Sequence, residues 1–189
     1  MYDVFDDPYC YEGTSVLKNR LDLRTQDKLT EFEHAISSQR AEEPLPAGNL
    51  DQKHYCALHR HLYQDVYDWA GELRTVRTSK GGNMFCYPEH ITAQLKKLFG
   101  KLAAAKKFRG LDADGFASAA SNFLAELNVI HPFREGNGRT QLTFLKLLGT
   151  AAGHSIEFNR LDAPEMLDAM IVSFSGNEEP LARLIRQLV

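Results

Sequence analysis

Apolar residues recur at helical spacing along most of this chain, and the stretch that ends at residue 130 shows the pattern clearly. Apolar side chains fall there at positions 116, 119, 123, 127 and 130, a spacing that places them on one face of an amphipathic helix. The same pattern predicts helices near residues 25–41, 51–70, 88–107, 112–130, 139–152, 162–174 and 179–188. The fold class is therefore predicted to be all-α.

The segment from about residue 74 to 87 interrupts this helical pattern. Two short β-prone runs flank Gly81 and Gly82, and a Gly-Gly pair suits a tight hairpin turn because glycine adopts positive φ at no steric cost. We predict a small β-hairpin, and its tip comprises Ser79, Lys80, Gly81, Gly82, Asn83 and Met84. A lone two-stranded hairpin is marginal in water, so this one should pack against the helices.

Length and composition favour one domain over residues 1–189, because a chain of this size can bury a sizeable core. Charged residues make up 25% of the chain, and the net charge is −3. No predicted helix face carries a stripe of Lys and Arg, and the lysines between residues 96 and 107 are interpreted as a solvated face. Direct binding of nucleic acid is therefore not predicted.

The sequence also argues against a membrane or secreted protein. No apolar run approaches the ~20 residues that a membrane-spanning helix needs, and residues 1–7 are acidic where a signal peptide would be basic. Cys10, Cys56 and Cys86 are odd in number and far apart, which suits reduced thiols in place of disulfides. We expect a soluble, cytoplasmic protein without a membrane partner.

A short polar loop between two predicted helices carries the densest chemistry of the chain. It reads His131-Pro132-Phe133-Arg134-Glu135-Gly136-Asn137-Gly138-Arg139 and leads into the N-terminus of the next helix. Free backbone N–H groups and the positive end of the helix dipole attract anions at such a position. The two glycines let phosphate oxygens come close to these N–H groups. The cation Arg139 would be unfavourable at the positive end of the helix dipole, and a bound anion would explain its presence there. We therefore predict a phosphate-binding site.

Two side chains of this loop suit metal binding and proton transfer. Mg²⁺ commonly takes one or two carboxylates together with substrate phosphates, which makes Glu135 the candidate metal ligand. Of the side chains in the loop, that of His131 has an ordinary pKa close to neutral pH. It is therefore suited to accept a proton from a hydroxyl nucleophile.

The loop and the residues after it resemble the signature of the Fic family (filamentation induced by cAMP), H-x-F-x-[D/E]-G-N-G-R-x-x-R, at every specified position except the last. The resemblance implies a helical Fic domain that transfers AMP from ATP, with Mg²⁺, to a Tyr, Thr or Ser hydroxyl of a target protein. It also implies the residue roles: His131 is the general base, Glu135 binds Mg²⁺, Phe133 anchors the loop in the core, and Gly136, Asn137, Gly138 and Arg139 bind the nucleotide phosphates.

The exception is Leu142, which stands where the Fic signature has a second arginine. In the family that arginine pairs with the γ-phosphate of ATP and with an inhibitory glutamate. Its replacement leaves two alternatives open: a Fic-fold transferase that uses another nucleotide or phosphate donor, and a binding module whose catalysis has decayed. Leu142 also continues the apolar stripe of its helix, and Lys146, one turn on, could supply a substitute charge.

Two further segments extend the resemblance over nearly the whole chain. The segment from Leu62 to Arg74 precedes the predicted hairpin, which in Fic proteins forms a flap over the active-site loop and aligns the target by main-chain hydrogen bonds. The segment from Asp7 to Asn19 resembles the opening of compact bacterial members. The resemblance therefore implies that residues 79–84 dock the target protein.

The regulatory expectation also rests on the resemblance. Fic proteins are held inactive by a Ser/Thr-x-x-x-Glu-Gly/Asn motif, and the nearest strings here, beginning at Ser38 and Ser175, miss it at the last position. A compact member without this motif resembles the class controlled by a small helical antitoxin. The chain is therefore expected to be the toxin of such a pair, with a bacterial type II topoisomerase as a plausible target.

Other interpretations of the sequence carry less weight. His61 and Asp65 are four residues apart in a region that also holds His54 and His59, but no further ligand follows at metal-binding spacing. His131 and Glu135 could also be metal ligands of a hydrolase, but the Gly-Asn-Gly-Arg continuation indicates phosphate binding instead. An unrelated helical interaction protein is a further alternative.

Overall fold

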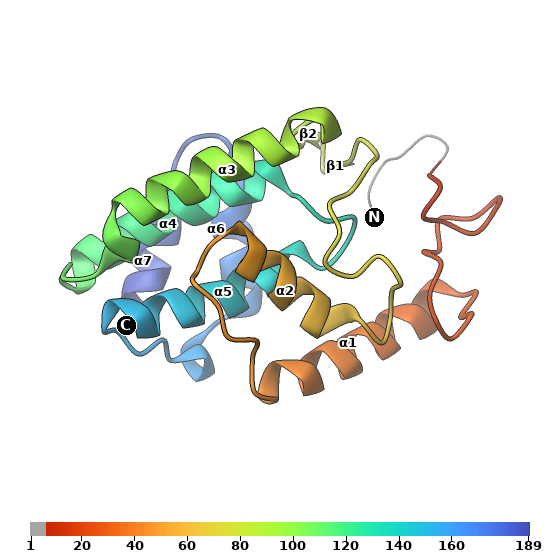
Figure 1. Ribbon diagram of the computed structural model, residues 1–189, viewed down its shortest axis with the longest axis horizontal. Coiled ribbons are helices and arrows are strands. Elements are labelled where there is room, and N and C mark those ends of the chain that lie inside the picture. The colour runs from red at the N-terminus through yellow and green to blue at the C-terminus, as the bar shows by residue number, and fades with distance from the viewer. Residues whose placement is uncertain (1–6) are drawn as a thin grey trace.

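The computed structural model describes residues 7–189, so the acidic segment 1–6 lies outside the described residues. It confirms a mostly helical fold with one small antiparallel sheet (Figure 1). The described α-helices are α1 (Gln26–Glu42), α2 (Gln52–Tyr63), α3 (Pro88–Ala104), α4 (Ala113–Ile130), α5 (Asn137–Ala152), α6 (Ala163–Phe174) and α7 (Glu179–Leu188). Two short 3₁₀ helices, η1 (Lys106–Phe108) and η2 (Phe158–Arg160), connect them. No helix among these residues has both the length and the apolar character to cross a membrane.

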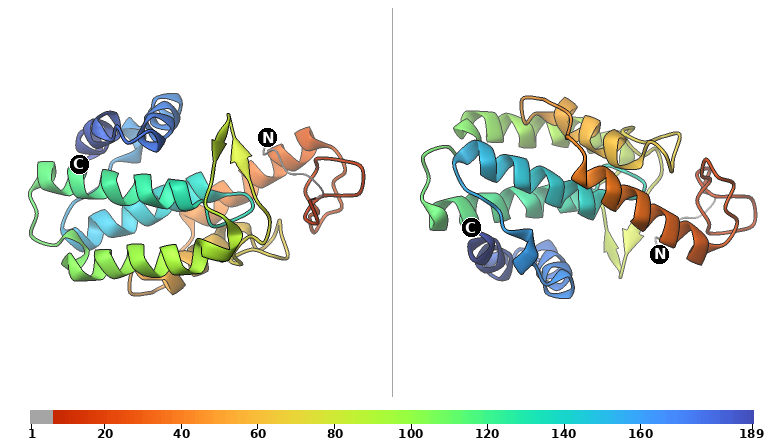
Figure 2. Two further views of the ribbon diagram at one scale, coloured as in Figure 1. Left: turned by 90° about the horizontal axis from the view of Figure 1, so that it is seen from above. Right: turned by 90° about the horizontal axis from the view of Figure 1, so that it is seen from below.

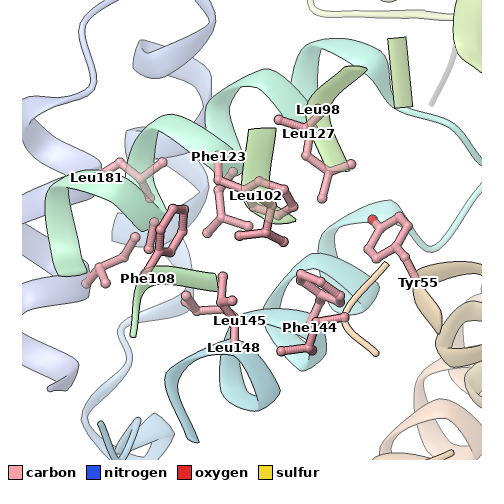
Figure 3. Close-up of a cluster of buried hydrophobic side chains, with 14 of the residues drawn as sticks. Tyr55, Leu98, Leu102, Phe108, Phe123, Leu127, Phe144, Leu145, Leu148 and Leu181 are labelled. Atoms are coloured by element: carbon pink, nitrogen blue, oxygen red, sulfur yellow. The ribbon is translucent and has the colours of Figure 1, made fainter. Parts of the chain in front are cut away.

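Helix α4 is the centre of the fold. The Asp112 side chain caps its N-terminus by accepting a hydrogen bond from the Gly115 N–H at 2.8 Å. The helix packs against α3, α5, α6 and α7, and its apolar face supplies Phe116, Phe123 and Leu127 to the main core. Figure 3 shows these helices meeting around the buried aromatic and leucine side chains. Burial of each large apolar side chain contributes about 1.5–3 kcal/mol, so this core holds the ends of α4 and α5 in place.

The predicted helix over residues 51–70 was wrong in its second half, because α2 ends at Tyr63. The chain continues in turns up to Gly71. In a continuing helix the Val66 carbonyl would accept a hydrogen bond from residue 70, but it accepts one from the Arg20 N–H at 2.9 Å instead. A contact with the N-terminal segment therefore overrides the helical spacing.

A second apolar cluster lies beside the main core and holds the N-terminal segment. It includes Leu29 of α1, Leu62 of α2 and Tyr67 of the following turn, together with Cys10 and Leu17. The turn residues thus bury their apolar stripe against α1 and the N-terminal segment without forming a helix.

The predicted hairpin is present, and its strands are two residues each. Strand β1 (Ser79–Lys80) pairs antiparallel with β2 (Asn83–Met84), with Ser79 opposite Met84 and Lys80 opposite Asn83. Gly81 and Gly82 both have positive φ, as a tight two-residue turn requires. Figure 2 shows the hairpin projecting at the end of the helical bundle where the loop between α4 and α5 lies.

The buried side chain of Arg74 joins the hairpin to the end of α4. Its guanidinium donates to the carbonyls of Val76 and Cys86 at 2.6 Å each, and to those of His131 at 2.7 Å and Ile130 at 3.3 Å. The residue is 2% exposed, and a planar guanidinium suits this set of acceptors because its donors lie in a fixed fork. Both base segments of the hairpin are thereby held against the C-terminus of α4.

We predict that Arg74→Met lowers the free energy of unfolding by at least about 3 kcal/mol, because several buried carbonyls lose charged hydrogen-bond donors. Urea unfolding measures this change. The matched control, Arg183→Met, replaces an exposed arginine of α7 and should stay within about 0.5 kcal/mol of the wild type. Equal stability of the two variants would contradict the structural role assigned to Arg74.

Candidate active site

The loop between α4 and α5 is closed by its own asparagine. Asn137 Oδ1 accepts from the Phe133 N–H at 3.0 Å, and Asn137 Nδ2 donates to the Phe133 carbonyl at 2.8 Å. The ring of Phe133 is fully buried and stacks on His59 with ring centroids 3.8 Å apart. The predicted anchor therefore lies in the core, and the Asn137 side chain is engaged with the loop backbone. What Asn137 can offer an anion is its backbone N–H at the start of α5.

His131 follows the last residue of α4 and adopts the left-handed conformation, with φ 47° and ψ 62°. Pro132 comes next and lacks the N–H that a continuing helix would need. The imidazole is buried and stacks on Phe85 with centroids 3.8 Å apart. Its Nδ1 lies 3.3 Å from the Asn128 carbonyl, which only accepts hydrogen bonds, so Nδ1 carries the proton. Nε2 is then the basic nitrogen of the ring.

Burial sets the protonation state of His131. Desolvation lowers its pKa to about 3, opposed by the hydrogen bond to the Asn128 carbonyl and assisted by the positive charges of Arg74 and Lys80. The imidazole is therefore neutral at physiological pH, which is the form that can accept a proton.

The N-terminus of α5 presents the features of an anion site. Gly136 precedes the helix with φ 79°, and a Cβ added there would lie 2.4 Å from the Tyr63 ring, so only glycine fits. Gly138 is exposed, and a Cβ added there would meet nothing within 4 Å. Nη1 of Arg139 is buried without a hydrogen-bond partner among residues 7–189. A buried guanidinium nitrogen that lacks an acceptor fits a bound phosphate.

Glu135 lies at the same end of the loop. One of its carboxylate oxygens accepts from the Gly136 N–H at 3.0 Å, and the side chain is half-buried at the wall of the site. The carboxylate retains further lone pairs that could bind a cation. The structure thus brings His131, Glu135 and Arg139 to one cavity, and their predicted roles stay predictions.

These residues border a cavity of about 570 Å³. The loop and the start of α5 contribute Glu135, Gly138 and Arg139 to its lining. Apolar side chains line it as well, among them Leu124 of α4 and Met166 and Met170 of α6. A cavity that combines charged and apolar walls suits a nucleotide, which has a charged and an apolar part.

The hairpin forms one wall of this cavity. Lys80, Gly81 and Asn83 line it, and Phe85, directly after β2, stacks on His131. Ser79 is buried at the base of the hairpin, whereas Met84 is 56% exposed and points away from the core. The segment predicted to dock a target therefore lies beside the imidazole.

His59 is a part of the site that the sequence did not reveal. Its Nδ1 accepts from the Gly71 N–H at 2.8 Å, so Nε2 carries the proton and donates to the Glu135 carbonyl at 3.0 Å. Burial lowers its pKa to about 3. One neutral histidine thus holds both the turn after α2 and the loop. His61 instead contacts the Arg40 carbonyl at 2.8 Å, and Asp65 forms an ion pair with Arg40, so these two side chains do not form a metal site.

Glu33 of α1 is a second residue that sequence analysis missed, since no local motif marks it. Its carboxylate accepts a hydrogen bond from the Tyr67 hydroxyl at 2.5 Å and lines the cavity near Glu135 and Arg139. Burial raises its pKa to about 7, and the negative charge of Glu135 adds to that rise. The part of the cavity beside Glu135 and Arg139 therefore holds a carboxyl whose pKa lies close to neutral pH.

The N-terminal segment closes the opposite side of the loop. Arg134 and Asp7 form an ion pair at 2.6 Å, with 5% of each side chain exposed. A further cavity of about 850 Å³ lies here, between the N-terminal segment, α1 and the loop. It shares Glu33, Lys80 and Glu135 with the first cavity, so the two cavities meet at these residues.

Comparison with known proteins identifies the family. The Fic/DOC family profile matches residues 49–148. Over 189 residues the chain is 51% identical to the probable protein adenylyltransferase y4lH of Sinorhizobium fredii, covering 100% of this chain and 98% of that protein. It is also 36% identical to the protein adenylyltransferase VbhT of Bartonella schoenbuchensis, covering 98% of this chain and 40% of VbhT. The chain belongs to the Fic/DOC family, and these relatives carry the name of a nucleotidyltransferase.

Solved Fic structures agree with this assignment. The BepC protein of Bartonella tribocorum, crystallised with AMPPNP, superimposes with a TM-score of 0.86 at 30% identity and covers 95% of each chain. The N-terminal Fic domain of a cell filamentation protein of Bartonella quintana, crystallised with ADP, gives a TM-score of 0.87 at 30% identity and covers 95% of this chain and 93% of that one. Both relatives bind adenine nucleotides.

We predict that Glu33→Gln stabilises the protein at pH 8 by up to about 3 kcal/mol and leaves stability at pH 4.5 unchanged. The folded-state pKa of this carboxyl is raised from 4.5 to about 7, so the folded state binds more protons than the unfolded state in that window. The free energy of unfolding therefore falls as the pH rises from 4.5 to 7, because the carboxyl must ionise in its buried position. Glutamine does not ionise and avoids this loss.

Urea unfolding at both pH values measures this effect. Glu31→Gln, at an exposed position of the same helix, is the matched control and should show no pH-dependent gain. A gain for Glu33→Gln of equal size at both pH values would contradict the assigned titration.

Proposed function

We propose that this chain is a protein adenylyltransferase that transfers AMP from ATP to a Tyr, Thr or Ser hydroxyl of a target protein. The observation that carries the proposal is the pairing of a neutral histidine, His131, with an anion site at the start of α5. The unpaired Nη1 of Arg139 lies in that site. The adenylyltransferase names of the relatives support the same reaction.

The residues at the phosphate end fit a triphosphate with its metal. Backbone N–H groups of Asn137 and Gly138 would cradle phosphate oxygens, and Arg139 would pair with them. The Gly136 N–H donates to the Glu135 carboxylate, so it would join this set only when Glu135 releases it. Glu135 would hold Mg²⁺, which supplies charge neutralisation for the phosphates. The apolar side chains of α4 and α6 that line the cavity would then contact the nucleoside.

His131 would act on the target hydroxyl. Its Nε2 accepts the hydroxyl proton as the oxygen forms a bond to the α-phosphorus, and the bond from that phosphorus to the bridging oxygen of the β-phosphate breaks. Pyrophosphate leaves, and AMP stays on the target. A bound triphosphate brings negative charge close to the ring, which raises the low pKa of His131 and strengthens it as a base.

The hairpin is the proposed docking element for the target. Lys80, Gly81 and Asn83 line the cavity beside His131, and an extended target segment could add to the main chain of the hairpin, residues 79–84. Phe133 serves the site indirectly, because its burial fixes the loop that presents His131 and Glu135.

The partner assignments follow from the family resemblance. We propose that the chain acts in the cytoplasm as the toxin of a toxin–antitoxin pair, that a small helical antitoxin restrains it, and that a bacterial type II topoisomerase is a target. Expression of the chain alone should then arrest bacterial growth, and expression of His131→Ala should not. Unimpaired growth with the wild-type chain would contradict the toxin proposal.

Leu142 favours one alternative, a Fic-fold transferase with a different donor. Its side chain lines the cavity and packs partly against the core, so it offers no charge at the position where the family signature has arginine. Incubation with Mg²⁺ and each of ATP, GTP, CTP and UTP, followed by intact-mass spectrometry, identifies the donor from the mass of the added group. An adduct formed from a nucleotide other than ATP would replace the leading proposal with this alternative.

We predict that His131→Ala lowers transfer by about 10²–10⁴-fold and leaves ATP affinity within a few-fold of wild type, because the base acts on the target hydroxyl. The left-handed backbone at this position costs alanine roughly 1 kcal/mol, so the fold should persist. His34→Ala, an exposed position on α1, should retain full transfer. Undiminished transfer by His131→Ala would contradict the base assignment.

A further inference from the structure

The side chain of Gln141 is buried at the wall of the cavity with an unused donor. The residue is 2% exposed, and its Nε2 has no hydrogen-bond partner within the described part of the chain. An amide nitrogen carries two donor hydrogens, and a buried donor without an acceptor costs free energy. Native proteins rarely keep such a group unless something else satisfies it.

The position of Gln141 indicates which part of a ligand it would meet. It lies four residues beyond Asn137, which is about 6 Å along the axis of α5 from the helix N-terminus. It lines the same cavity as Leu124 and Asn128 of α4 and Met170 of α6. Gln141 thus lies about one helical turn beyond the start of α5 and lines the cavity together with apolar residues of α4 and α6.

The neighbouring polar groups of α4 have other partners. Asn128 Nδ2 donates to the Met170 carbonyl at 3.2 Å, and the Asn128 carbonyl faces His131 Nδ1. The Arg139 guanidinium lies closer to the helix N-terminus, where phosphates would bind. Among the described residues that line this cavity, Gln141 is therefore the one whose neutral amide donor is buried without a protein acceptor.

We propose that Gln141 Nε2 donates a hydrogen bond to an acceptor on the nucleoside of the bound nucleotide, and so determines which nucleosides the site accepts. This inference rests on the proposed function, because it takes a nucleotide as the ligand. The acceptor is either a ribose hydroxyl oxygen or a ring nitrogen of the purine, and both chemistries match a neutral amide donor. The apolar residues around it would contact the faces of the base.

The test is Gln141→Met, which keeps the length and volume of the side chain and removes the donor. The free protein should be as stable as wild type or more stable, because an unsatisfied buried amide is replaced by an apolar group. ATP affinity, measured by calorimetry with Mg²⁺, should fall about five- to tenfold. Gln94→Met, at an exposed position of α3, is the matched control and should leave both quantities unchanged.

Nucleotide analogues distinguish the two acceptors. If the ribose is bound, 2′-deoxy-ATP or 3′-deoxy-ATP should bind the wild type about five- to tenfold more weakly than ATP, and Gln141→Met should not discriminate. If the purine is bound, the 1-deaza, 3-deaza or 7-deaza analogue should show the same pattern.

The contrary outcomes separate this inference from the proposed function. Unchanged ATP affinity in Gln141→Met, or equal discrimination by the variant and the wild type against every analogue, would overturn the role of Gln141 alone. If neither the wild type nor Gln94→Met bound ATP, both the proposed function and this inference would fail. Lower stability of free Gln141→Met with unchanged affinity would show that Gln141 serves packing.

Discussion

The active-site architecture depends on the buried guanidinium of Arg74. It donates to carbonyls on both sides of the hairpin and to the carbonyls of Ile130 and His131 at the end of α4. The main chain of Arg74 adds a hydrogen bond to the Pro132 carbonyl at 2.9 Å. A single cation thus fixes the distance between the segment that would hold the target and the imidazole that would act on it. Proton transfer requires a fixed distance between the two, because a small displacement of a catalytic group lowers the reaction rate strongly.

The loop between α4 and α5 is held rigidly by side chains, but some of its polar groups have no partner among the described residues. The side chains of His59, Phe133 and Asn137 hold the loop. In contrast, a Cβ added at Gly138 would meet no atom within 4 Å, and Nη1 of Arg139 is buried without a hydrogen-bond partner among the described residues. Burial lowers the pKa of His131, so its imidazole is neutral, and raises the pKa of the Glu33 carboxyl to about 7. The contacts that hold the loop therefore stabilise a site in which some polar groups lack hydrogen-bond partners among the described residues. Such groups are expected where a charged ligand binds.

The sequence predicted the features that arise from local patterns. Helix α4 follows from its apolar spacing and the hairpin turn from Gly81 and Gly82. The glycines before Arg139 mark the start of α5, where the anion site stays a prediction. It did not predict that α2 ends at Tyr63, because the hydrogen bond from Arg20 to Val66 joins segments far apart in the chain. Glu33 and His59 were missed for the same reason, since their roles depend on Tyr67, Gly71 and Glu135 being brought together by the fold.

A crystal structure of the chain with Mg²⁺ and a non-hydrolysable ATP analogue would show whether the nucleotide binds as proposed. We expect phosphate oxygens within hydrogen-bond distance of the backbone N–H groups at the start of α5 and of Arg139 Nη1, with the α-phosphorus facing His131 Nε2. A nucleotide bound elsewhere, such as in the cavity beside the N-terminal segment, or bound with its α-phosphorus away from His131, would contradict the proposal.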